Sequence, residues 1–359
     1  MTIESQLSSF LTEWNNDAPT VSVSTSGSTG VPKVIQIEKA RMIESAKSTC
    51  SFLNMKQGNT ALLCMPLNYI AGKMMVVRSI VAGLRLITVE PSGHPLHGIT
   101  EHIDLAAMVP LQIYNSLSVP SELAVLSDIS NTLIGGGAID TQMEEKLRTV
   151  KGQLWSTYGM TETLSHIALR AVNGPRRSPA YTPLDGVYIS LSADSTLVID
   201  APKISPSILT TNDIAKLNAD GTFTIIGRKD NVICSGGIKI QIEEVETVLE
   251  RDLPMPFAIT STHDEKFGEA VIMLVKADRI TDDILSAISH LPKYWQPKSI
   301  ILTNHIPTTG TGKKARAEIR AMAMAETHKI PLKKCNSILC QKIRQHTSAP
   351  TADRNQPDG

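Results

Sequence analysis

The sequence has no net charge and no long uninterrupted hydrophobic run. Lys and Arg together number 35, as do Asp and Glu, so no electrostatic feature favours a nucleic-acid or anionic-membrane partner. The apolar stretch from Met74 to Val89 contains Arg78 and Arg85 and is too short to span a bilayer. The N-terminus MTIESQLSSFLTEW carries acidic residues where a signal peptide has a basic region. We therefore expect a cytoplasmic protein without a membrane partner.

Cysteine is also scarce, and its spacing excludes the common cysteine-based sites. No two of the five cysteines have CxxC spacing, and nearby histidines do not complete a zinc pattern. The plain explanation is buried or free thiols in a reducing cytosol. The five residues are Cys50, Cys64, Cys234, Cys335 and Cys340.

Length and patterning favour an α/β protein of two domains. A chain of 359 residues exceeds what one hydrophobic core usually organises. Residues 140–150 have a helical pattern, with Asp140 as a plausible N-cap and Met143 and Leu147 on one face. Strands alternating with helices predict a largely parallel sheet. Buried strands are predicted at Thr60 to Met65, Arg85 to Val89 and Asn131 to Ile134.

The pattern changes after Gly174 and again near Asp230. Asp220-Gly221 between two alternating runs is a strong hairpin signal and predicts an antiparallel β subdomain. From Asp230 onward, helical patterns at 242–250 and 282–290 and a strand at 270–276 indicate a smaller α+β unit. We therefore predict a large domain at 1–229 with mixed and parallel sheets, a small mobile domain at 230–330, and a flexible tail at 331–359.

Two glycine- and hydroxyl-rich segments have the chemistry of a nucleotide site. TSGSTGVPK, at 25–33, follows a strand-like run; its glycines allow close backbone approach to a polyphosphate, and its hydroxyl groups and Lys33 suit phosphate oxygens. A solvent-exposed loop is the alternative, and the spacing excludes a Walker A loop. STYGMTET, at 156–163, offers Tyr158 as a stacking face for a purine and Glu162 as an oxygen ligand for Mg²⁺. Alone, Glu162 would more often be a capping or surface residue.

Two further segments lie in the second half of the chain. GRKDNVICSGGIKIQIEEVE, at 227–246, joins a charged run to a Ser-Gly-Gly turn and an amphipathic helix, and it could be only an interdomain linker. PTTGTGKKAR, at 307–316, is a glycine-rich loop that presents Lys313 and also lacks Walker A spacing. As an isolated loop residue, Lys313 would most simply be a solvated surface lysine.

Together and in this order, the four segments resemble the adenylate-forming superfamily of acyl-CoA synthetases, peptide-synthetase adenylation domains and firefly luciferases. The resemblance covers roughly residues 20 to 320. It implies that the chain binds ATP, Mg²⁺, a small carboxylic acid and coenzyme A, and it leaves a homo-oligomer possible. It assigns the ATP phosphates to Thr25, Ser26, Gly27, Ser28, Thr29, Gly30 and Lys33. It assigns adenine, ribose and neighbouring contacts to Gly135, Gly136, Gly137, Tyr158, Asp213 and Arg228.

The resemblance also implies the catalytic residues. Thr161 and Glu162 would serve phosphate and Mg²⁺, and Lys313 would bridge the substrate carboxylate and the α-phosphate. Because adenylation brings two anions together, positioning and charge stabilisation must dominate, and no general base is needed. Asp230 would be the hinge about which the small domain rotates. Gly236 and Gly237 would then line the passage for the CoA thiol.

The acid is the least determined feature. PLNYIAGKMMVVRSIVAGLRL, at 66–86, resembles the corresponding segment of o-succinylbenzoate–CoA ligases of menaquinone biosynthesis. This implies that Tyr69 lines the acyl pocket and that Arg78 pairs with a second carboxylate. A structural salt bridge is the alternative for Arg78, and core packing for Tyr69. Only Met1 to Ser24 precede the phosphate loop, so we expect part of the usual sheet to be missing or replaced.

Other functions remain open at this point. The chain could ligate another aryl or acyl acid to CoA, or it could load an acid onto a carrier protein. A non-catalytic nucleotide-binding relative is a further alternative. Against it, a purely structural descendant has no physical need to keep Lys33, Glu162, Asp213 and Lys313 together.

Overall fold

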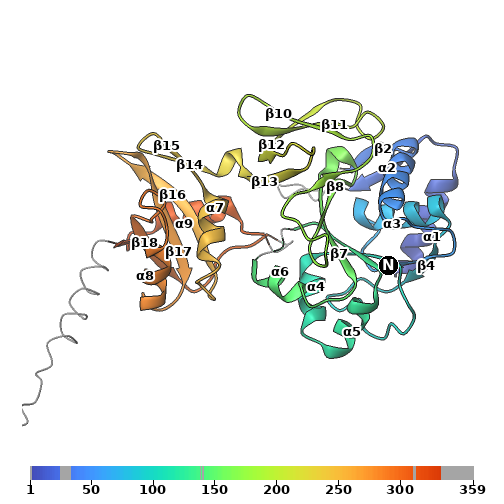
Figure 1. Ribbon diagram of the computed structural model, residues 1–359, viewed down its shortest axis with the longest axis horizontal. Helices are drawn as coiled ribbons and strands as arrows, with labels where there is room; N and C mark the ends of the chain where they lie inside the picture. Colours follow the sequence, from blue (N-terminus) through green and yellow to red (C-terminus); the bar gives the residue numbers. More distant parts are fainter. Residues whose placement is uncertain (1, 25–33, 138, 140, 310–312, 333–359) are drawn as a thin grey trace, which may run out of the picture. The chain divides into compact units, whose positions relative to one another are not determined.

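The chain divides into two compact units, Met1–Lys229 and Asp230–Gly359. The structure is a computed structural model that describes residues 2–24, 34–137, 139, 141–309 and 313–332. Figure 1 labels the elements of both units. Each unit has its own buried hydrophobic clusters, one in the first unit and two in the second, among the residues described. The two units are therefore considered separately.

A seven-stranded sheet forms the centre of the first unit. Its strand order is β4-β3-β5-β6-β7-β8-β9. The first five strands pair in parallel, and β8 and β9 join antiparallel at one side. The strands are β3 (Thr60–Leu63), β4 (Arg85–Thr88), β5 (Leu105–Met108), β6 (Asn131–Ile134), β7 (Gln153–Gly159), β8 (His166–Ala171) and β9 (Thr182–Pro183).

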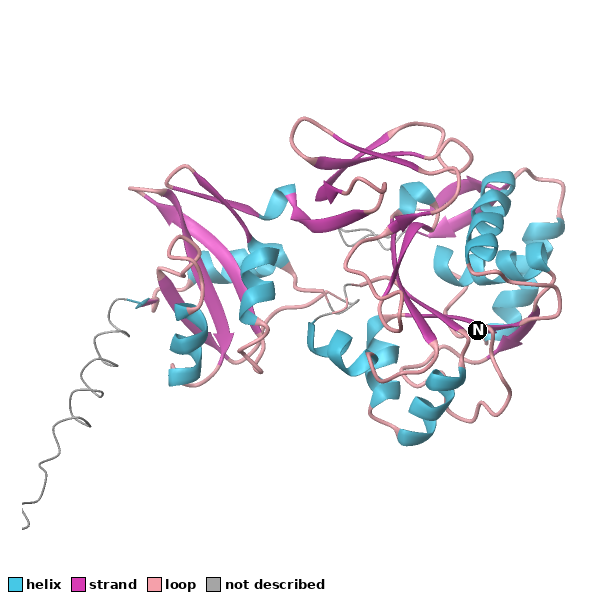
Figure 2. Cartoon of the chain, viewed as in Figure 1, coloured by secondary structure: helices cyan, strands magenta, loops and turns pink. Residues whose placement is uncertain are grey.

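Helices connect the parallel strands and cover the sheet, as Figure 2 shows in cyan and magenta. Helix α3 packs against α2 and against β3, and α4 packs against α5. Proline at the first turn begins both α4 and α5, and Gly83 in the left-handed conformation ends α3. The helices are α1 (Ile3–Asn15), α2 (Lys39–Phe52), α3 (Ile70–Ala82), α4 (Pro110–Leu117), α5 (Pro120–Asp128) and α6 (Thr141–Leu147).

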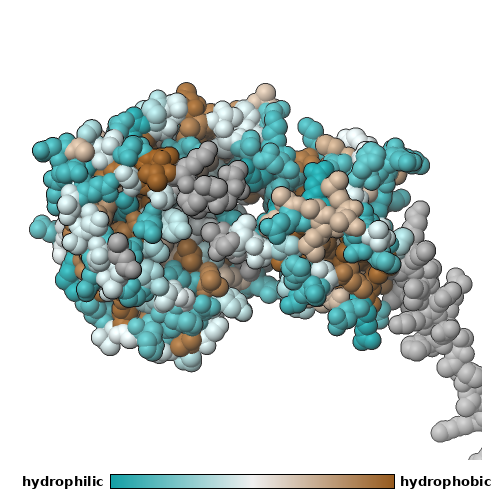
Figure 3. Space-filling view, turned by 180° about the vertical axis from the view of Figure 1, so that it is seen from behind, coloured by the Kyte–Doolittle hydropathy of each residue, from teal (hydrophilic) through white to brown (hydrophobic). Residues whose placement is uncertain are grey.

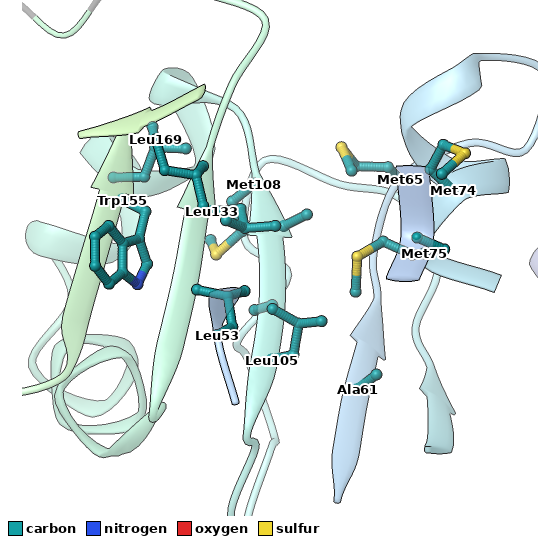
Figure 4. Packing of buried hydrophobic residues seen from close by; sticks show 14 of the residues in the cluster. Leu53, Ala61, Met65, Met74, Met75, Leu105, Met108, Leu133, Trp155 and Leu169 are labelled. Carbon is teal, nitrogen blue, oxygen red and sulfur yellow. The ribbon is translucent and has the colours of Figure 1, made fainter. Parts of the chain in front are cut away.

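The core of this unit lies between the sheet and these helices (Figure 4). Leu105, Met108 and Leu133 project from adjacent strands, and Met75 of α3 packs in the same cluster. The Trp155 ring meets Phe52 edge-on, with ring centroids 5.2 Å apart. Burial of such apolar surface at about 25 cal/mol per Å² is the main force holding the layers together.

The segment before residues 25–33 forms α1 and the first strand of a small antiparallel sheet, β1 (Thr20–Ser24) with β2 (Val34–Glu38). Buried Lys73 of α3 ties both elements to the core. Its Nζ donates to the Ser22 carbonyl at 2.6 Å and lies 3.4 Å from Glu13 Oε2. Hydrogen bonds from Ser22 N and Lys73 hold the pKa of Glu13 below its ordinary value, although burial opposes this.

A four-stranded antiparallel sheet completes the first unit. Its strands are β10 (Tyr188–Leu191), β11 (Thr196–Asp200), β12 (Leu209–Leu217) and β13 (Phe223–Arg228). Strands β12 and β13 pair up to Leu217↔Phe223, and Asp220-Gly221 lies in the turn that connects them. The predicted hairpin is therefore confirmed. Gly221 has φ of +82°, the conformation that this turn chemistry favours.

The second unit is a mixed sheet flanked by three described helices. The strand order is β15-β14-β17-β18-β19, and β16 also pairs with β17. Thr281 caps α8, whose first turn carries Asp282 and Asp283. The elements are β14 (Val232–Ser235), β15 (Ile238–Gln241), α7 (Ile242–Leu249), β16 (Phe257–Asp264), β17 (Gly268–Lys276), α8 (Asp282–Ser289), β18 (Ser299–Thr303), α9 (Arg316–Ala325) and β19 (Ile330–Pro331).

Two local predictions need correction. The strand at Arg85 to Val89 exists as β4, but it is the edge of the sheet and is exposed to half-buried rather than buried. The helix expected over 140–150 is the shorter α6, which ends at Leu147 and is followed by a turn; Asp140 lies outside the described residues. Most of the expected tail at 331–359 also lies outside them.

On the face drawn in Figure 3, brown hydrophobic residues stand in small separate groups among teal hydrophilic ones. Contiguous apolar patches of several hundred Å² are what usually marks an interface. Within the part of the chain that the structure describes, no helix is long and apolar enough to cross a membrane.

Candidate active site

The expected adenine loop follows β6, and the second motif begins within the neighbouring strand β7 of the large sheet. Strand β6 ends at Ile134, which pairs with Ser156 of β7, so Gly135 lies beside Thr157. A side chain at 135 would bring its Cβ within 2.6 Å of Thr157 Oγ1, and Gly136 has φ of +78°. Only glycine suits both positions. Because carboxyl ends of parallel strands are where α/β sheets bind ligands, this edge is the candidate nucleotide site.

Tyr158, Asp213 and Arg228 form a hydrogen-bonded group in the first unit. The Tyr158 hydroxyl donates to Asp213 Oδ2 at 2.6 Å, and Arg228 Nη1 lies 3.4 Å from Asp213 Oδ1. Asp213 and Arg228 are register partners on β12 and β13. Burial, followed by the charge of Asp213, raises the pKa of Tyr158, so this hydroxyl remains a donor. The structure therefore brings together three residues that the sequence assigned to one nucleotide.

Two aromatic residues that the sequence analysis did not single out support Tyr158. The Tyr158 ring meets Phe223 edge-on at 5.3 Å between centroids and lies 5.7 Å from the Tyr181 ring. Tyr181 and Phe223 stack, and the Tyr181 hydroxyl shares a 2.9 Å hydrogen bond with Ser156 Oγ. Phe223 lies in the alternating run that follows Asp220-Gly221, and Tyr181 lies in the segment before β9; neither was assigned a role from the sequence.

The end of the second motif forms a tight turn, the 3₁₀ segment Thr161–Thr163. Thr163 Oγ1 accepts from Met160 N at 2.9 Å and lies 2.8 Å from the Ser165 carbonyl, which fixes the turn. Glu162 is exposed on it. Among the described residues no group of three His, Cys, Asp or Glu could hold a metal. One carboxylate with substrate phosphates is a normal Mg²⁺ environment, so Glu162 fits that ion.

Arg78 is buried in α3 without a carboxylate partner among the described residues. It is 2% exposed, its Nη2 donates to Ser165 Oγ at 2.8 Å, and its Nη1 lies 3.6 Å from Met75 Sδ. Its Nε has no hydrogen-bond partner. Burial lowers the pKa of Arg78 to about 10. The structural salt bridge considered from the sequence is therefore not present in the described structure.

The groups near Arg78 are polar but not anionic. His166 Nε2 lies 3.0 Å from Thr49 Oγ1, and His166 Nδ1 lies 3.4 Å from Ser165 Oγ. Burial, and then the charge of Arg78, lowers the pKa of His166 well below its ordinary value, so the imidazole is neutral at pH 7. Arg78 and Ser165 thus connect α3 to the turn that carries Glu162.

Tyr69 precedes α3 and is 47% exposed, so core packing is excluded as its main role. It stands at the start of the helix that carries Arg78. Gly72, one turn further, approaches the Pro66 carbonyl so closely that a Cβ would lie 2.4 Å from its oxygen. This contact fixes the start of α3 against the preceding segment.

The second unit carries the remaining expected site residues. Lys313 is exposed, in the segment that leads to α9. Gly236 and Gly237 form the two-residue turn between β14 and β15, with φ of +60° and +82°, which gives both glycines a local structural cause. Asp230 is the first residue of the unit and lies in the 3₁₀ turn Lys229–Asn231. Residues 25–33, expected from the sequence to bind the ATP phosphates, lie outside the described residues.

Comparison with known proteins identifies the family. Residues 7–200, more than half of the chain, match the family of AMP-binding enzymes. The chain belongs to this family. A curated relative, the 2-succinylbenzoate–CoA ligase of Bacillus cytotoxicus, is 25% identical over 334 residues, which cover 83% of this chain and 69% of that protein. The 2-succinylbenzoate–CoA ligase of Bacillus cereus is 24% identical over 333 residues.

Solved structures agree on the fold. An acyl-CoA synthetase (AMP-forming)/AMP-acid ligase II-like protein from Dyadobacter fermentans matches with a TM-score of 0.63 and 29% identity, over 88% of this chain and 93% of that one. The o-succinylbenzoate CoA synthetase of Bacillus subtilis, in complex with its acyl-adenylate, matches with a TM-score of 0.72 and 22% identity. The match covers 87% of this chain and 70% of that one. The predicted family, α/β fold class and AMP-forming acid–CoA ligase class are confirmed.

Proposed function

We propose that this enzyme converts o-succinylbenzoate, ATP and CoA to o-succinylbenzoyl-CoA, AMP and pyrophosphate through an acyl-adenylate. The curated relatives at about 24% identity act on this acid by name, which supports the proposal. The observation that carries it is Arg78, a buried cation without an anionic partner among the described residues. Burying an unpaired charge is costly, and a ligand carboxylate would offset that cost.

The position of Arg78 suits the distal carboxylate of a dicarboxylic acid. Its hydrogen bond to Ser165 ties it to the turn that carries Glu162, and that turn follows Tyr158. An acid held at Arg78 by one carboxylate could therefore extend its other carboxylate toward the ATP phosphates. Tyr69, at the start of the same helix, would line the acyl pocket.

The other residues have roles in the first half-reaction. Asp213 and Arg228 would hold the ribose, Tyr158 and the 135–137 glycines would flank adenine, and residues 25–33 would bind the phosphates. Mg²⁺ would neutralise phosphate charge at Glu162. Lys313 would stabilise the charge that develops as the substrate carboxylate attacks the α-phosphate. In the second half-reaction Gly236 and Gly237 would admit the CoA thiol.

The direct test is CoA-dependent thioester formation from o-succinylbenzoate, ATP and Mg²⁺, with benzoate and a medium-chain fatty acid in parallel. Turnover of succinylbenzoate alone supports the whole proposal. Turnover of a different acid keeps the adenylation chemistry and rejects the substrate. Pyrophosphate release without thioester points to an enzyme that loads a carrier protein.

A variant of Arg78 then tests whether this residue binds the distal carboxylate. Arg78→Ala should raise KM for succinylbenzoate by about 100-fold, the loss expected for about 3 kcal/mol of a charge-assisted contact. KM for a monocarboxylic acid should change far less, because such an acid has no group for Arg78 to bind. Equal increases for both acids would reject Arg78 as the distal-carboxylate anchor.

A further inference from the structure

Two adjacent lysines, Lys313 and Lys314, precede α9, and their side chains differ in exposure and in contacts. Lys313 is exposed, whereas the Lys314 ammonium lies 2.9 Å from Glu246 Oε2 and 4.6 Å from the centre of the Phe257 ring. The sequence offers no physical reason why one of two neighbouring lysines should point outward. The nearest carboxylate to Lys314 is Glu246, about seventy residues earlier in the chain, and Glu250 lies 3.9 Å away.

Glu246 is a buried acceptor on α7 that gathers several donors. It is 5% exposed, and Arg316 binds it with both terminal nitrogens, at 2.8 and 2.7 Å. The backbone N–H of Ile259 on β16 donates to it at 2.8 Å. With Lys314, two cations and one amide thus converge on a single carboxylate. Bidentate Arg–carboxylate pairs of this kind set geometry as well as energy.

The same region holds both arms of the loop that carries Lys313. Thr309 N donates to the Lys313 carbonyl at 2.7 Å, and Ala315 N donates to the Pro307 carbonyl at 2.9 Å. Lys314 forms an antiparallel bridge with Thr308. The loop base is therefore a short ladder, and its outgoing arm ends on the two cations that Glu246 holds.

We propose that Glu246 is the positioning residue for Lys313: by binding Lys314 and Arg316 it turns the second lysine inward and holds the first outward. This proposal rests on the proposed function, in which Lys313 serves adenylation and is not needed for thioester formation. Glu246 does not touch substrate. It acts by fixing the backbone on which the catalytic lysine stands.

The test separates the two half-reactions in Glu246→Gln, which keeps the side-chain shape and removes the charge. Pyrophosphate release from ATP and acid should fall by about 10- to 100-fold, since misplacement by about 1 Å costs that much. Conversion of supplied o-succinylbenzoyl adenylate to thioester should stay within about two-fold of the wild type. Equal losses in both half-reactions would show a merely structural role and overturn the proposal.

Arg320→Gln is the matched control. Arg320 lies one turn after Arg316 on α9 and pairs with Glu269, not with Glu246, at 3.1 Å. Both half-reactions should be unchanged in it. If Glu246→Gln folds poorly, Arg316→Lys keeps the charge but loses the bidentate contact, and it should show a smaller loss with the same selectivity. A loss shared by both half-reactions in Arg316→Lys would also reject the proposal.

A second measurement does not depend on activity. Brief acetylation of the full chain with acetic anhydride should label Lys313 faster than Lys314, and Glu246→Gln should raise the labelling of Lys314 toward that of Lys313. Persistent protection of Lys314 in that variant would overturn the proposal. If the wild type releases no pyrophosphate with any acid, the proposed function fails, while the labelling ratio still decides the role of Glu246.

Discussion

The hydroxyl of Tyr158 and the carboxylate of Asp213, 55 residues apart in sequence, are joined by a 2.6 Å hydrogen bond. The bond links the end of a parallel strand in the large sheet to β12 of the antiparallel sheet. A carboxylate accepts at several lone-pair positions, so this bond leaves acceptors for a ribose diol. The bond thus fixes the orientation of Asp213, the residue proposed to hold the ribose.

Removing the Tyr158 hydroxyl should therefore weaken ATP binding. Tyr158→Phe keeps the ring and its packing on Phe223, but Asp213 loses a donor that fixes its orientation. A hydrogen bond to a charged group is worth about 1.5–3 kcal/mol, so KM for ATP should rise roughly ten-fold or more. Steady-state kinetics at saturating acid would measure this change, with kcat largely preserved.

Tyr181→Phe is the matched control for that variant. It removes a hydroxyl from the same aromatic cluster, but the lost bond goes to Ser156 rather than to Asp213. Its KM for ATP should stay near the wild-type value. Similar increases in both variants would mean that the cluster's packing, and not the bond to Asp213, controls nucleotide affinity.

Because Arg78 is buried without an anionic partner among the described residues, we expect it to lower the stability of the ligand-free protein while it strengthens acid binding. Arg78→Met keeps the volume and removes a buried charge, so the free energy of unfolding of the ligand-free protein should stay level or rise by about 1–3 kcal/mol. Acid binding should be lost in the same variant. Urea unfolding, followed by tryptophan fluorescence, would measure the first effect.

Lys73→Met on the same helix should behave in the opposite way. Lys73 donates to the Ser22 carbonyl and pairs with Glu13, and its loss would leave both without that partner. The free energy of unfolding should fall by about 2 kcal/mol. If Arg78→Met destabilises the protein as much as Lys73→Met does, Arg78 has structural partners that account for its burial.

Features specified by short segments could be predicted from the sequence. The Asp220-Gly221 hairpin needs positive φ at one residue, and glycine supplies it. The helix over Ile242–Leu249 has an apolar face with 3.6-residue spacing, and it forms nearly as expected. Candidate residues for a nucleotide site could be named because glycine, hydroxyl and carboxylate groups suited to phosphate chemistry stand close together in the chain.

Features that depend on contacts between distant parts of the chain could not be predicted from the sequence. The edge position of β4 follows from strand order, which its apolar sequence does not encode. Tyr181 and Phe223 pack against Tyr158 from later segments of the chain, and their contacts with it depend on the fold. The pair of Glu246 with Arg316 joins residues 70 positions apart, and a charged residue on a helix normally indicates a solvated face. Burial of polar groups is decided by the whole fold.

The Glu246 contacts also predict a pH dependence of stability. Burial works to raise the pKa of Glu246, but hydrogen bonds from Arg316 and the charges of Lys314 and Arg316 hold it below its ordinary value of 4.5. A lowered folded pKa means that the stabilisation is complete above about pH 4.5 and is lost as pH falls through the folded value. Wild type and Glu246→Gln should therefore differ most at neutral pH, by about 3 kcal/mol, and converge in acid.

Unfolding of the two proteins between pH 7 and pH 3 would measure that difference. Glu318→Gln removes an exposed carboxylate from α9 and serves as the control, with little difference from wild type at any pH. A gap between wild type and Glu246→Gln that stays constant with pH would contradict the charge-based account of these contacts.

Glu162 should set the Mg²⁺ requirement of adenylation. Glu162→Gln keeps one oxygen but removes the charge, so the Mg²⁺ concentration for half-maximal pyrophosphate release should rise by about ten-fold, with activity partly restored at high Mg²⁺. Glu145→Gln, which alters an exposed carboxylate paired with Arg148, should leave the Mg²⁺ dependence unchanged. A lower kcat with an unchanged Mg²⁺ midpoint would remove Glu162 from the metal site.

Asp230 offers the test of the predicted hinge. It lies in a 3₁₀ turn, whose φ of about −50 to −70° a proline can adopt, so Asp230→Pro should tolerate the conformation seen here while barring large changes in φ. If the second half-reaction needs rotation at this residue, thioester formation from supplied adenylate should fall by more than about ten-fold, and pyrophosphate release should be largely kept. Asp230→Ala removes the same carboxylate without restricting φ, and both half-reactions should remain close to wild type in it. Matching losses in the proline and alanine variants would assign the effect to the carboxylate, and normal thioester formation in Asp230→Pro would place the hinge elsewhere.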